Sequence, residues 1–124
     1  MALLEQVDGW VGSLWTALEA TSSAPDQWAL VVTSDHGGVG NIHFDPAELN
    51  TYKIPLYVVA SGVPADTDLY ALAGSTRGDP GEGRPSYAEP VQPIRNGDAG
   101  NLVLQLLGLP AVPGSLMRDL DLGR

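Results

Sequence analysis

Apolar residues recur with a helical period near each end of this chain. Residues 2–21 carry an apolar side chain every three or four positions with polar residues between them, which predicts an amphipathic helix. The apolar positions are Leu3, Leu4, Val7, Trp10, Val11, Leu14, Trp15 and Leu18. Residues 98–107 repeat the period, and Gly108 followed by Pro110 predicts where this second helix ends. Asn96 or Asp98 is expected to cap its start.

Two apolar runs between these helices do not alternate with polar residues. Residues 28–33 and 54–60 are apolar at consecutive positions, which is typical of strands buried on both faces of a parallel sheet. Pro55 is expected at the start of the second strand, where no ladder hydrogen bond is lost. Helices and strands in this order predict an α/β fold.

The remaining segments carry turn signals. Residues 21–26 predict a short loop, and residues 61–95, rich in proline and glycine, predict a long surface loop with one helical turn near residues 69–72. Residues 78–83 lack the lysine of a phosphate-binding loop and follow no strand, so no phosphate cradle is expected there. The tail at residues 109–124 is expected to add little to the core. The sequence has no internal repeat.

Charge and composition restrict the classes of partner. Six basic and fifteen acidic residues give a net charge of −9, which disfavours a nucleic-acid surface. A small anionic substrate stays compatible, because bound divalent cations reverse the local field. The absence of cysteine excludes disulfide and thiolate chemistry. No apolar run reaches the roughly 20 residues of a membrane span. Glu5 and Asp8 interrupt the first apolar stretch, so a secretory signal is not expected there.

The residues that carry chemistry lie directly after the first predicted strand. Asp35 and His36 follow the run that ends at Thr33, and His43 is the only other histidine. Ligands of open α/β sheets lie beyond the carboxyl ends of the strands, and Gly37 allows the chain to turn there. Because carboxylate and imidazole groups are suitable zinc ligands, this pattern predicts a metal site at Asp35, His36 and His43. The alternative is an ordinary loop with a solvated acid and two surface histidines.

Other candidate residues have simpler explanations. Asp45 precedes a proline and is first a turn residue. Ser34 is not expected to be a nucleophile, because residues as close in sequence as Ser34 and His36 rarely reach the required geometry and no nucleophile elbow surrounds them. Arg95 is a candidate anion contact, although surface packing is the simpler expectation. The three tryptophans are expected at core positions and not in an aromatic ligand-binding site.

Around Asp35, His36 and His43, the sequence resembles the C-terminal part of an alkaline phosphatase superfamily domain. This superfamily includes phosphatases, type I phosphodiesterases (nucleotide pyrophosphatases), sulfatases and phosphoglycerate mutases. The matching pieces, in chain order, are Val-Thr-Ser-Asp-His-Gly-Gly at 32–38, His43, Ile-Pro-Leu-Tyr-Val at 54–58, Asn-Gly-Asp at 96–98, Asn101-Leu102 and Leu-Leu-Gly-Leu-Pro at 106–110. The helix that carries Val7 and Asp8 also looks like the helix before this strand in those enzymes. The resemblance covers roughly residues 3–115.

The resemblance implies an α/β/α layered, alkaline phosphatase-like fold, with residues 1–124 as the C-terminal fragment of one domain. In the two-metal members, the aspartate and histidine of this motif bind one zinc and a later histidine binds the other. Carried over by position, Asp35 and His36 would hold the zinc that activates the nucleophile, and His43 would hold the second. Two ions roughly 3.5–4 Å apart clamp the attacking and leaving oxygens of an in-line displacement. The implied substrate is a small phosphoester, and many relatives are exported.

The family's nucleophile and its upstream metal ligands have no counterpart in this sequence. The family mechanism passes through a covalent intermediate on a serine or threonine, so no catalytic residue is assigned here and no hydrolase activity is expected from this chain alone. One alternative is a sulfatase-like fragment, whose single calcium ion prefers oxygen ligands to imidazole. Another is a non-catalytic α/β remnant that acts as an interaction module through residues 61–95.

Overall fold

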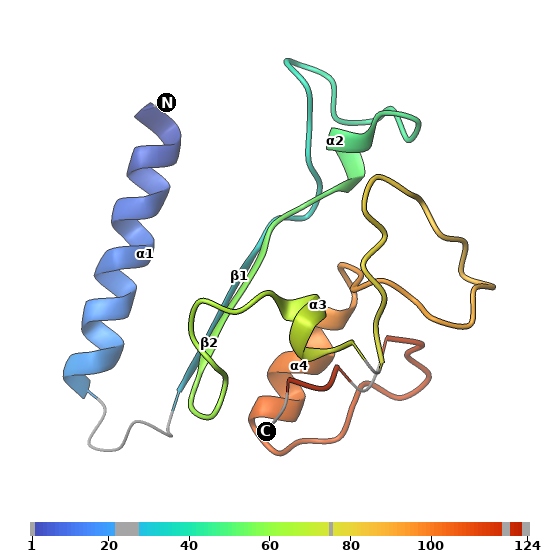
Figure 1. Ribbon diagram of the computed structural model, residues 1–124. Helices are drawn as coiled ribbons and strands as arrows, with labels where there is room; N and C mark the ends of the chain where they lie inside the picture. The colour runs from blue at the N-terminus through green and yellow to red at the C-terminus, as the bar shows by residue number, and fades with distance from the viewer. Residues whose placement is uncertain (1, 22–27, 75, 118–119, 123–124) are drawn as a thin grey trace.

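The fold is mixed α/β, with four helices and one two-stranded sheet in the part of the chain that the structure describes. This computed structural model describes residues 2–21, 28–74, 76–117 and 120–122 (Figure 1). The elements, in chain order, are α1 (Ala2–Thr21), β1 (Ala29–Thr33), α2 (Leu49–Tyr52), β2 (Leu56–Ala60), α3 (Leu69–Leu72) and α4 (Asp98–Leu106). Both predicted helices, both strands and the short turn at 69–72 are confirmed. The loop expected at residues 21–26 falls, after Thr21, outside the described residues.

The two strands run antiparallel, so the prediction of a parallel sheet is wrong. Val31 of β1 lies opposite Val58 of β2, and Thr33 lies opposite Leu56. Consecutive apolar residues indicate that both faces of a strand are covered, but they do not encode the direction of its neighbour. The connection decides the direction: residues 34–55 contain only the four-residue helix α2, and the chain returns alongside β1. As expected, Pro55 immediately precedes β2.

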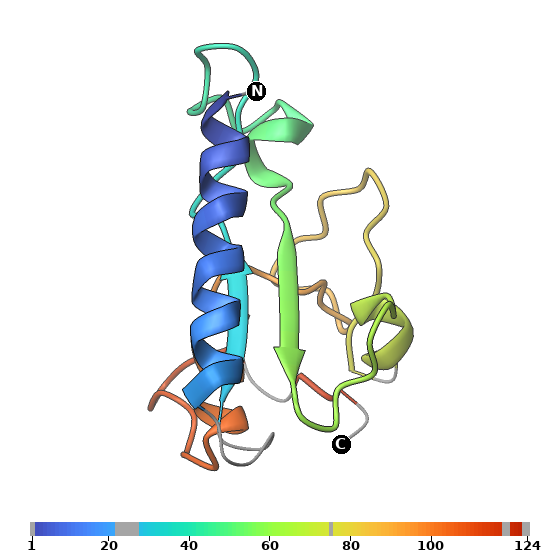
Figure 2. The same ribbon diagram turned by 90° about the vertical axis from the view of Figure 1, so that its left-hand side faces the viewer.

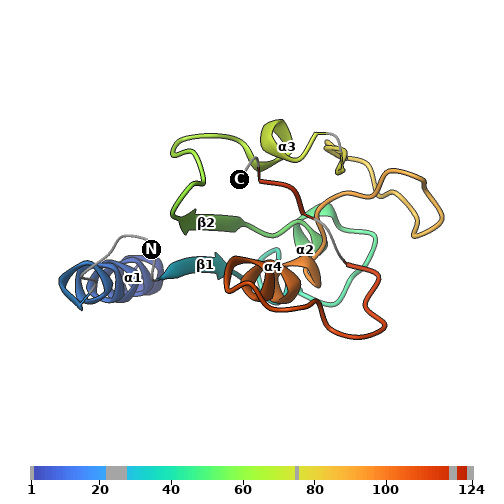
Figure 3. The same cartoon turned by 90° about the horizontal axis from the view of Figure 1, so that it is seen from below.

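A small core lies between α4, the sheet and the C-terminal segment. Its buried members are Ala73, Leu102, Leu120 and Leu122, with Val31 and Val58 of the sheet packed against them. The expectation that residues 109–124 add little to the core is therefore wrong. Figure 3 shows α4 lying against β1, and this contact places the start of α4 near the end of that strand. Neither strand has a fully buried residue, so the expectation that both faces of the strands are buried is also wrong.

Helix α1 stands on the opposite side of the sheet from α4, as Figures 1 and 3 show. None of its residues is buried, and the side chains of Leu3, Leu4 and Trp10 are 74%, 75% and 61% exposed. The core position expected for Trp10 is therefore wrong. Trp15 is half-buried and meets Trp28 edge to face, with ring centroids 5.5 Å apart. Figure 2 shows that the axis of α1 runs nearly parallel to the strands. Among the described helices, none has the length and apolar character needed to cross a bilayer.

Candidate metal centre and adjoining cleft

Asp35 and His36 lie where the chain leaves the end of β1. The Oδ1 atom of Asp35 accepts a hydrogen bond of 2.9 Å from the backbone N–H of His36. Its Oδ2 atom lies 3.5 Å from Nε2 of His36. The two side chains are 85% and 49% exposed, respectively, so a dissolved ion can reach both. The first two predicted ligands are therefore adjacent and accessible.

A tight turn brings His43 back to the same place. Val39 and Ile42 exchange two backbone hydrogen bonds of 2.8 and 2.9 Å, and Gly40 between them adopts a φ of +58°, which favours glycine. The ring of His43 stacks on the ring of His36, with centroids 5.0 Å apart and an interplanar angle of 19°. The structure thus places all three predicted metal ligands beside one another.

These three side chains do not enclose a common point in this conformation. Within the described ranges, no group of three or more His, Asp or Glu side chains is arranged to hold a metal ion. Stacked imidazoles present their faces to one another, whereas coordination needs the in-plane lone pair of a ring nitrogen. The exposed side chain of His43 must therefore rotate before all three side chains can bind the same metal ion.

The donor set itself fits a divalent transition metal such as zinc. The Nδ1 atom of His36 lies 2.8 Å from the carbonyl oxygen of Gly37. With the proton on Nδ1, this contact is a hydrogen bond that orients the ring and leaves Nε2 as the donor to a metal, on the side of Asp35. Backbone carbonyls commonly hold metal-ligating histidines in this way. The carboxylate and the oriented imidazole are therefore both suitable ligands for a zinc ion.

Gly37 is required by a close backbone approach. Its N–H donates a hydrogen bond of 2.9 Å to the carbonyl of Thr51. A Cβ atom at this position would lie 2.0 Å from the carbonyl oxygen of Asn50, a distance that real Cβ atoms do not reach. The order Asp-His-Gly therefore has a physical basis: two metal-binding side chains are followed by the residue that lets the turn pack against α2.

Asn96 ties this turn to the segment before α4. Its Nδ2 atom donates a hydrogen bond of 2.9 Å to the backbone carbonyl of Asp35, although the two residues are 61 positions apart. The expectation that Asn96 or Asp98 caps α4 is wrong, because the N-cap position is Gly97 and no side chain caps this helix.

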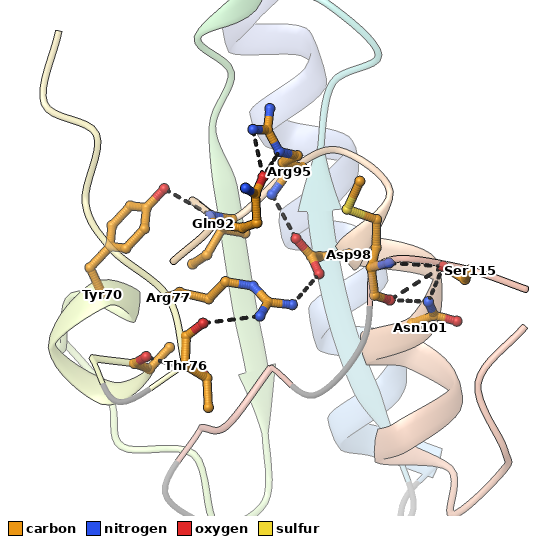
Figure 4. Close-up of polar contacts among 11 residues, drawn as sticks. Tyr70, Thr76, Arg77, Gln92, Arg95, Asp98, Asn101 and Ser115 are labelled. Carbon is orange, nitrogen blue, oxygen red and sulfur yellow. Dashed lines mark hydrogen bonds and ion pairs between the residues drawn. The ribbon is translucent and has the colours of Figure 1, made fainter. Parts of the chain in front are cut away.

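A buried ion pair holds the segment that carries Asn96. Asp98 is 1% exposed, and its Oδ1 atom lies 2.8 Å from Nη2 of Arg77. Its Oδ2 atom accepts a hydrogen bond of 2.7 Å from the backbone N–H of Arg95 (Figure 4). The sequence offered no signal for this pair, because Arg77 lies 21 residues earlier in a loop. The pair positions residues 95–98 and, through Asn96, the strand-end turn.

Asp45 and Arg95, the remaining sequence candidates, both make contacts within their own segments. The Oδ1 atom of Asp45 accepts a hydrogen bond of 2.9 Å from the N–H of Ala47, which is the turn contact that the sequence predicted. The guanidinium of Arg95 contacts Oε1 of Gln92 and lies over the ring of Tyr87, 4.1 Å from its centroid. Both Arg95 and Tyr87 line a cleft of about 660 Å³ that opens beside Asp35 and His36.

Comparison with known proteins supplies no relative from which a function can be transferred. Neither a protein-family model, nor a curated protein, nor a solved structure matches the chain. The chemistry of the site therefore follows from its own residues. An exposed carboxylate, an oriented imidazole and a second imidazole at a strand end offer oxygen and nitrogen donors to a divalent cation. The adjoining cleft of about 660 Å³ is lined in part by Asp35 and His36.

Proposed function

We propose that this chain supplies metal ligands to a metal-dependent phosphoric-ester hydrolase, a phosphatase or phosphodiesterase of the alkaline phosphatase superfamily. The observation that carries the proposal is the gathering of Asp35, His36 and His43 at the end of β1. The hydrogen bond from Asn96 to Asp35 adds support, because it joins two segments that the resemblance names. Asp35 and His36 bind one ion, His43 binds a second, and the substrate is a small phosphoester.

Each residue has a defined task in this proposal. Asp35 contributes negative charge, His36 contributes Nε2, and the carbonyl of Gly37 keeps the His36 ring in place. Ions held by Asp35, His36 and His43 would supply Lewis-acid polarisation of the phosphoryl group. No residue of this chain is assigned as the nucleophile, which in this proposal comes from outside these 124 residues.

The proposal also assigns this chain to an α/β/α layered fold. α1 and α4 lie on opposite sides of the sheet, which is the arrangement that such a fold requires (Figure 3). The apolar stripe of α1 is exposed, and the described sheet has only two strands, β1 and β2. Further strands beside this sheet would cover the exposed leucines and tryptophan of α1.

Metal titration of the purified chain tests the proposal. Isothermal titration with Zn²⁺, together with the visible absorption of bound Co²⁺, reports affinity and coordination. Asp35→Asn and His36→Gln are each expected to weaken Zn²⁺ binding at least about tenfold, equivalent to roughly 1.4 kcal/mol. His43→Gln is expected to remove a second, weaker equivalent. Asp45→Asn is the matched control, because Asp45 is a carboxylate of the same loop that serves a turn.

The titration also decides between the alternatives. Equal Zn²⁺ affinities for wild type, His36→Gln and Asp45→Asn would refute the metal site. Tighter binding of Ca²⁺ than of Zn²⁺ would favour the sulfatase-like alternative, since calcium prefers oxygen ligands. With Zn²⁺ present, the chain alone is expected to hydrolyse neither a generic phosphomonoester nor a generic phosphodiester. Metal-dependent turnover would contradict the assignment of the nucleophile to another segment.

The interaction-module alternative has less support from the structure. The segment 61–95 is tied back to the rest of the chain at several points instead of projecting freely. Lys53 reaches the carbonyl of Gly81 at 3.5 Å, and Arg84 donates a hydrogen bond to the carbonyl of Pro46. These contacts turn the segment into one wall of the cleft beside Asp35.

A further inference from the structure

Positive charge is concentrated in the cleft beside Asp35 and His36. Three of the six basic side chains in the sequence, those of Lys53, Arg84 and Arg95, line this cleft of about 660 Å³. The chain as a whole carries a net charge of −9. Half of the basic side chains of this acidic chain therefore lie in one cleft. The electrostatic potential in the cleft then differs from that expected from the net charge of the chain.

The charges of these three cations are not neutralised by ion pairs within the described residues. Lys53 contacts the carbonyl of Gly81, and Arg84 contacts the carbonyl of Pro46. Arg95 donates to Oε1 of Gln92, with distances of 2.9 and 2.7 Å from Nε and Nη2, and Nη2 lies 2.8 Å from the carbonyl oxygen of Pro85. All of these acceptors are neutral.

Carboxylates in the cleft do not cancel this positive charge. Asp35 and Asp79 are the acids among the lining residues. The Oδ1 atom of Asp79 accepts a hydrogen bond of 2.8 Å from the N–H of Gly81, which holds it in its own turn. Asp35 is assigned to the metal ion. The three cations therefore outnumber the carboxylates and retain net positive charge for a ligand.

Tyrosine rings hold the two guanidinium groups in place. Arg84 lies 4.6 Å from the ring centroid of Tyr52, and Arg95 lies 4.1 Å from that of Tyr87. A stacked guanidinium keeps its edge available for hydrogen bonds to an anion, and its restricted motion reduces the entropy lost on binding. Nη1 of Arg95 has no hydrogen bond to the described residues, so one edge of this group is available.

We propose that this cleft binds a second anionic group of the substrate, a phosphate or carboxylate carried on the part of the ester that leaves. Arginine is well suited to such oxyanions because its fork matches their geometry. This inference rests on the proposed function, which places the reacting phosphoryl group at Asp35 and His36. It narrows the substrate class to phosphoric esters with an additional negative charge, and esters of neutral alcohols are then poorer substrates.

Binding of inorganic pyrophosphate in the presence of EDTA tests the cleft separately from the metal. Chemical shifts of the ¹⁵N-labelled chain, including the side-chain N–H groups of arginine, report the affinity and the location. Arg84→Gln and Lys53→Gln are each expected to weaken binding about tenfold, because each removes one charged contact. Gln6→Glu is the matched control, since it changes the net charge by the same amount on the exposed surface of α1.

The outcomes separate this inference from the proposed function. Saturable shifts at Arg84, Tyr87 and Arg95, lost in the cleft variants and kept in Gln6→Glu, support the inference. Equal weakening by Arg84→Gln, Lys53→Gln and Gln6→Glu overturns it, because only the global charge then matters. Zinc binding without pyrophosphate binding also overturns it and leaves the metal site standing. Pyrophosphate binding without zinc binding overturns the proposed function and, with it, the assignment of this anion to a substrate.

Discussion

Replacement of Gly37 by alanine tests whether a backbone contact shapes the candidate metal centre. A Cβ atom at Gly37 would lie 2.0 Å from the carbonyl oxygen of Asn50 and 3.1 Å from that of Lys53. Ordinary van der Waals contact begins at 3.4 Å, so the turn and α2 must separate by about 1.4 Å. Both nearby atoms belong to backbone, so no side-chain rotation can relieve the clash.

The expected loss of stability has two parts. The hydrogen bond from Gly37 to the carbonyl of Thr51, 2.9 Å long, is broken by this separation. Such a bond contributes about 0.5–1.5 kcal/mol, and overpacking costs about 1–3 kcal/mol, so we expect a destabilisation of about 1.5–4.5 kcal/mol. The carbonyl of Gly37 moves with the turn and no longer orients His36. Zn²⁺ affinity is therefore expected to fall about tenfold, as for loss of other contacts that orient a ligand.

Urea unfolding followed by tryptophan fluorescence, with a parallel Zn²⁺ titration, measures both effects. Gly100→Ala is the matched control, because a Cβ atom at Gly100 meets nothing within 4 Å and the residue lies within α4. This control is expected to stabilise the protein by up to about 1 kcal/mol. If Gly37→Ala matched wild type in both unfolding free energy and Zn²⁺ affinity, the geometric argument for Asp-His-Gly would be refuted.

Two further predictions concern the segment before α4 and the loop beside it. Asp98→Asn removes the negative charge of the buried pair with Arg77. In urea unfolding, this change is expected to destabilise the fold by about 3–5 kcal/mol. A loss below about 1 kcal/mol, which is typical of surface ion pairs, would contradict the buried role of Asp98. Burial raises the pKa of Tyr70 above its ordinary value of 10.0, although the hydrogen bond that its hydroxyl accepts from the N–H of Ile94 acts in the opposite direction. Because the folded state holds this proton more tightly than the unfolded state, stability should fall as the pH rises from about 10 through the raised pKa. Tyr70→Phe should make this decline shallower, and identical pH profiles for the two proteins would disprove the assignment.

Local pattern was sufficient to predict most secondary structure. The apolar period of residues 2–21 and 98–107 located α1 and α4, because a helical repeat is a property of neighbouring residues. Pro55 marked the residue before β2, because proline cannot donate a ladder hydrogen bond within a strand. The proximity of Asp35, His36 and His43 was also accessible from sequence, since all three lie within nine positions and glycines allow the chain to turn between them.

The sequence by itself determined which stretches are helical or extended, and it predicted Asp35, His36 and His43 as metal ligands. Only the tertiary structure decided that β2 runs antiparallel to β1, that Asp98 meets Arg77 and that Asn96 reaches Asp35. The physical reason is the range of the contacts. Periodicity is set within a few residues, whereas strand direction and the buried ion pair depend on how loops bring distant segments together.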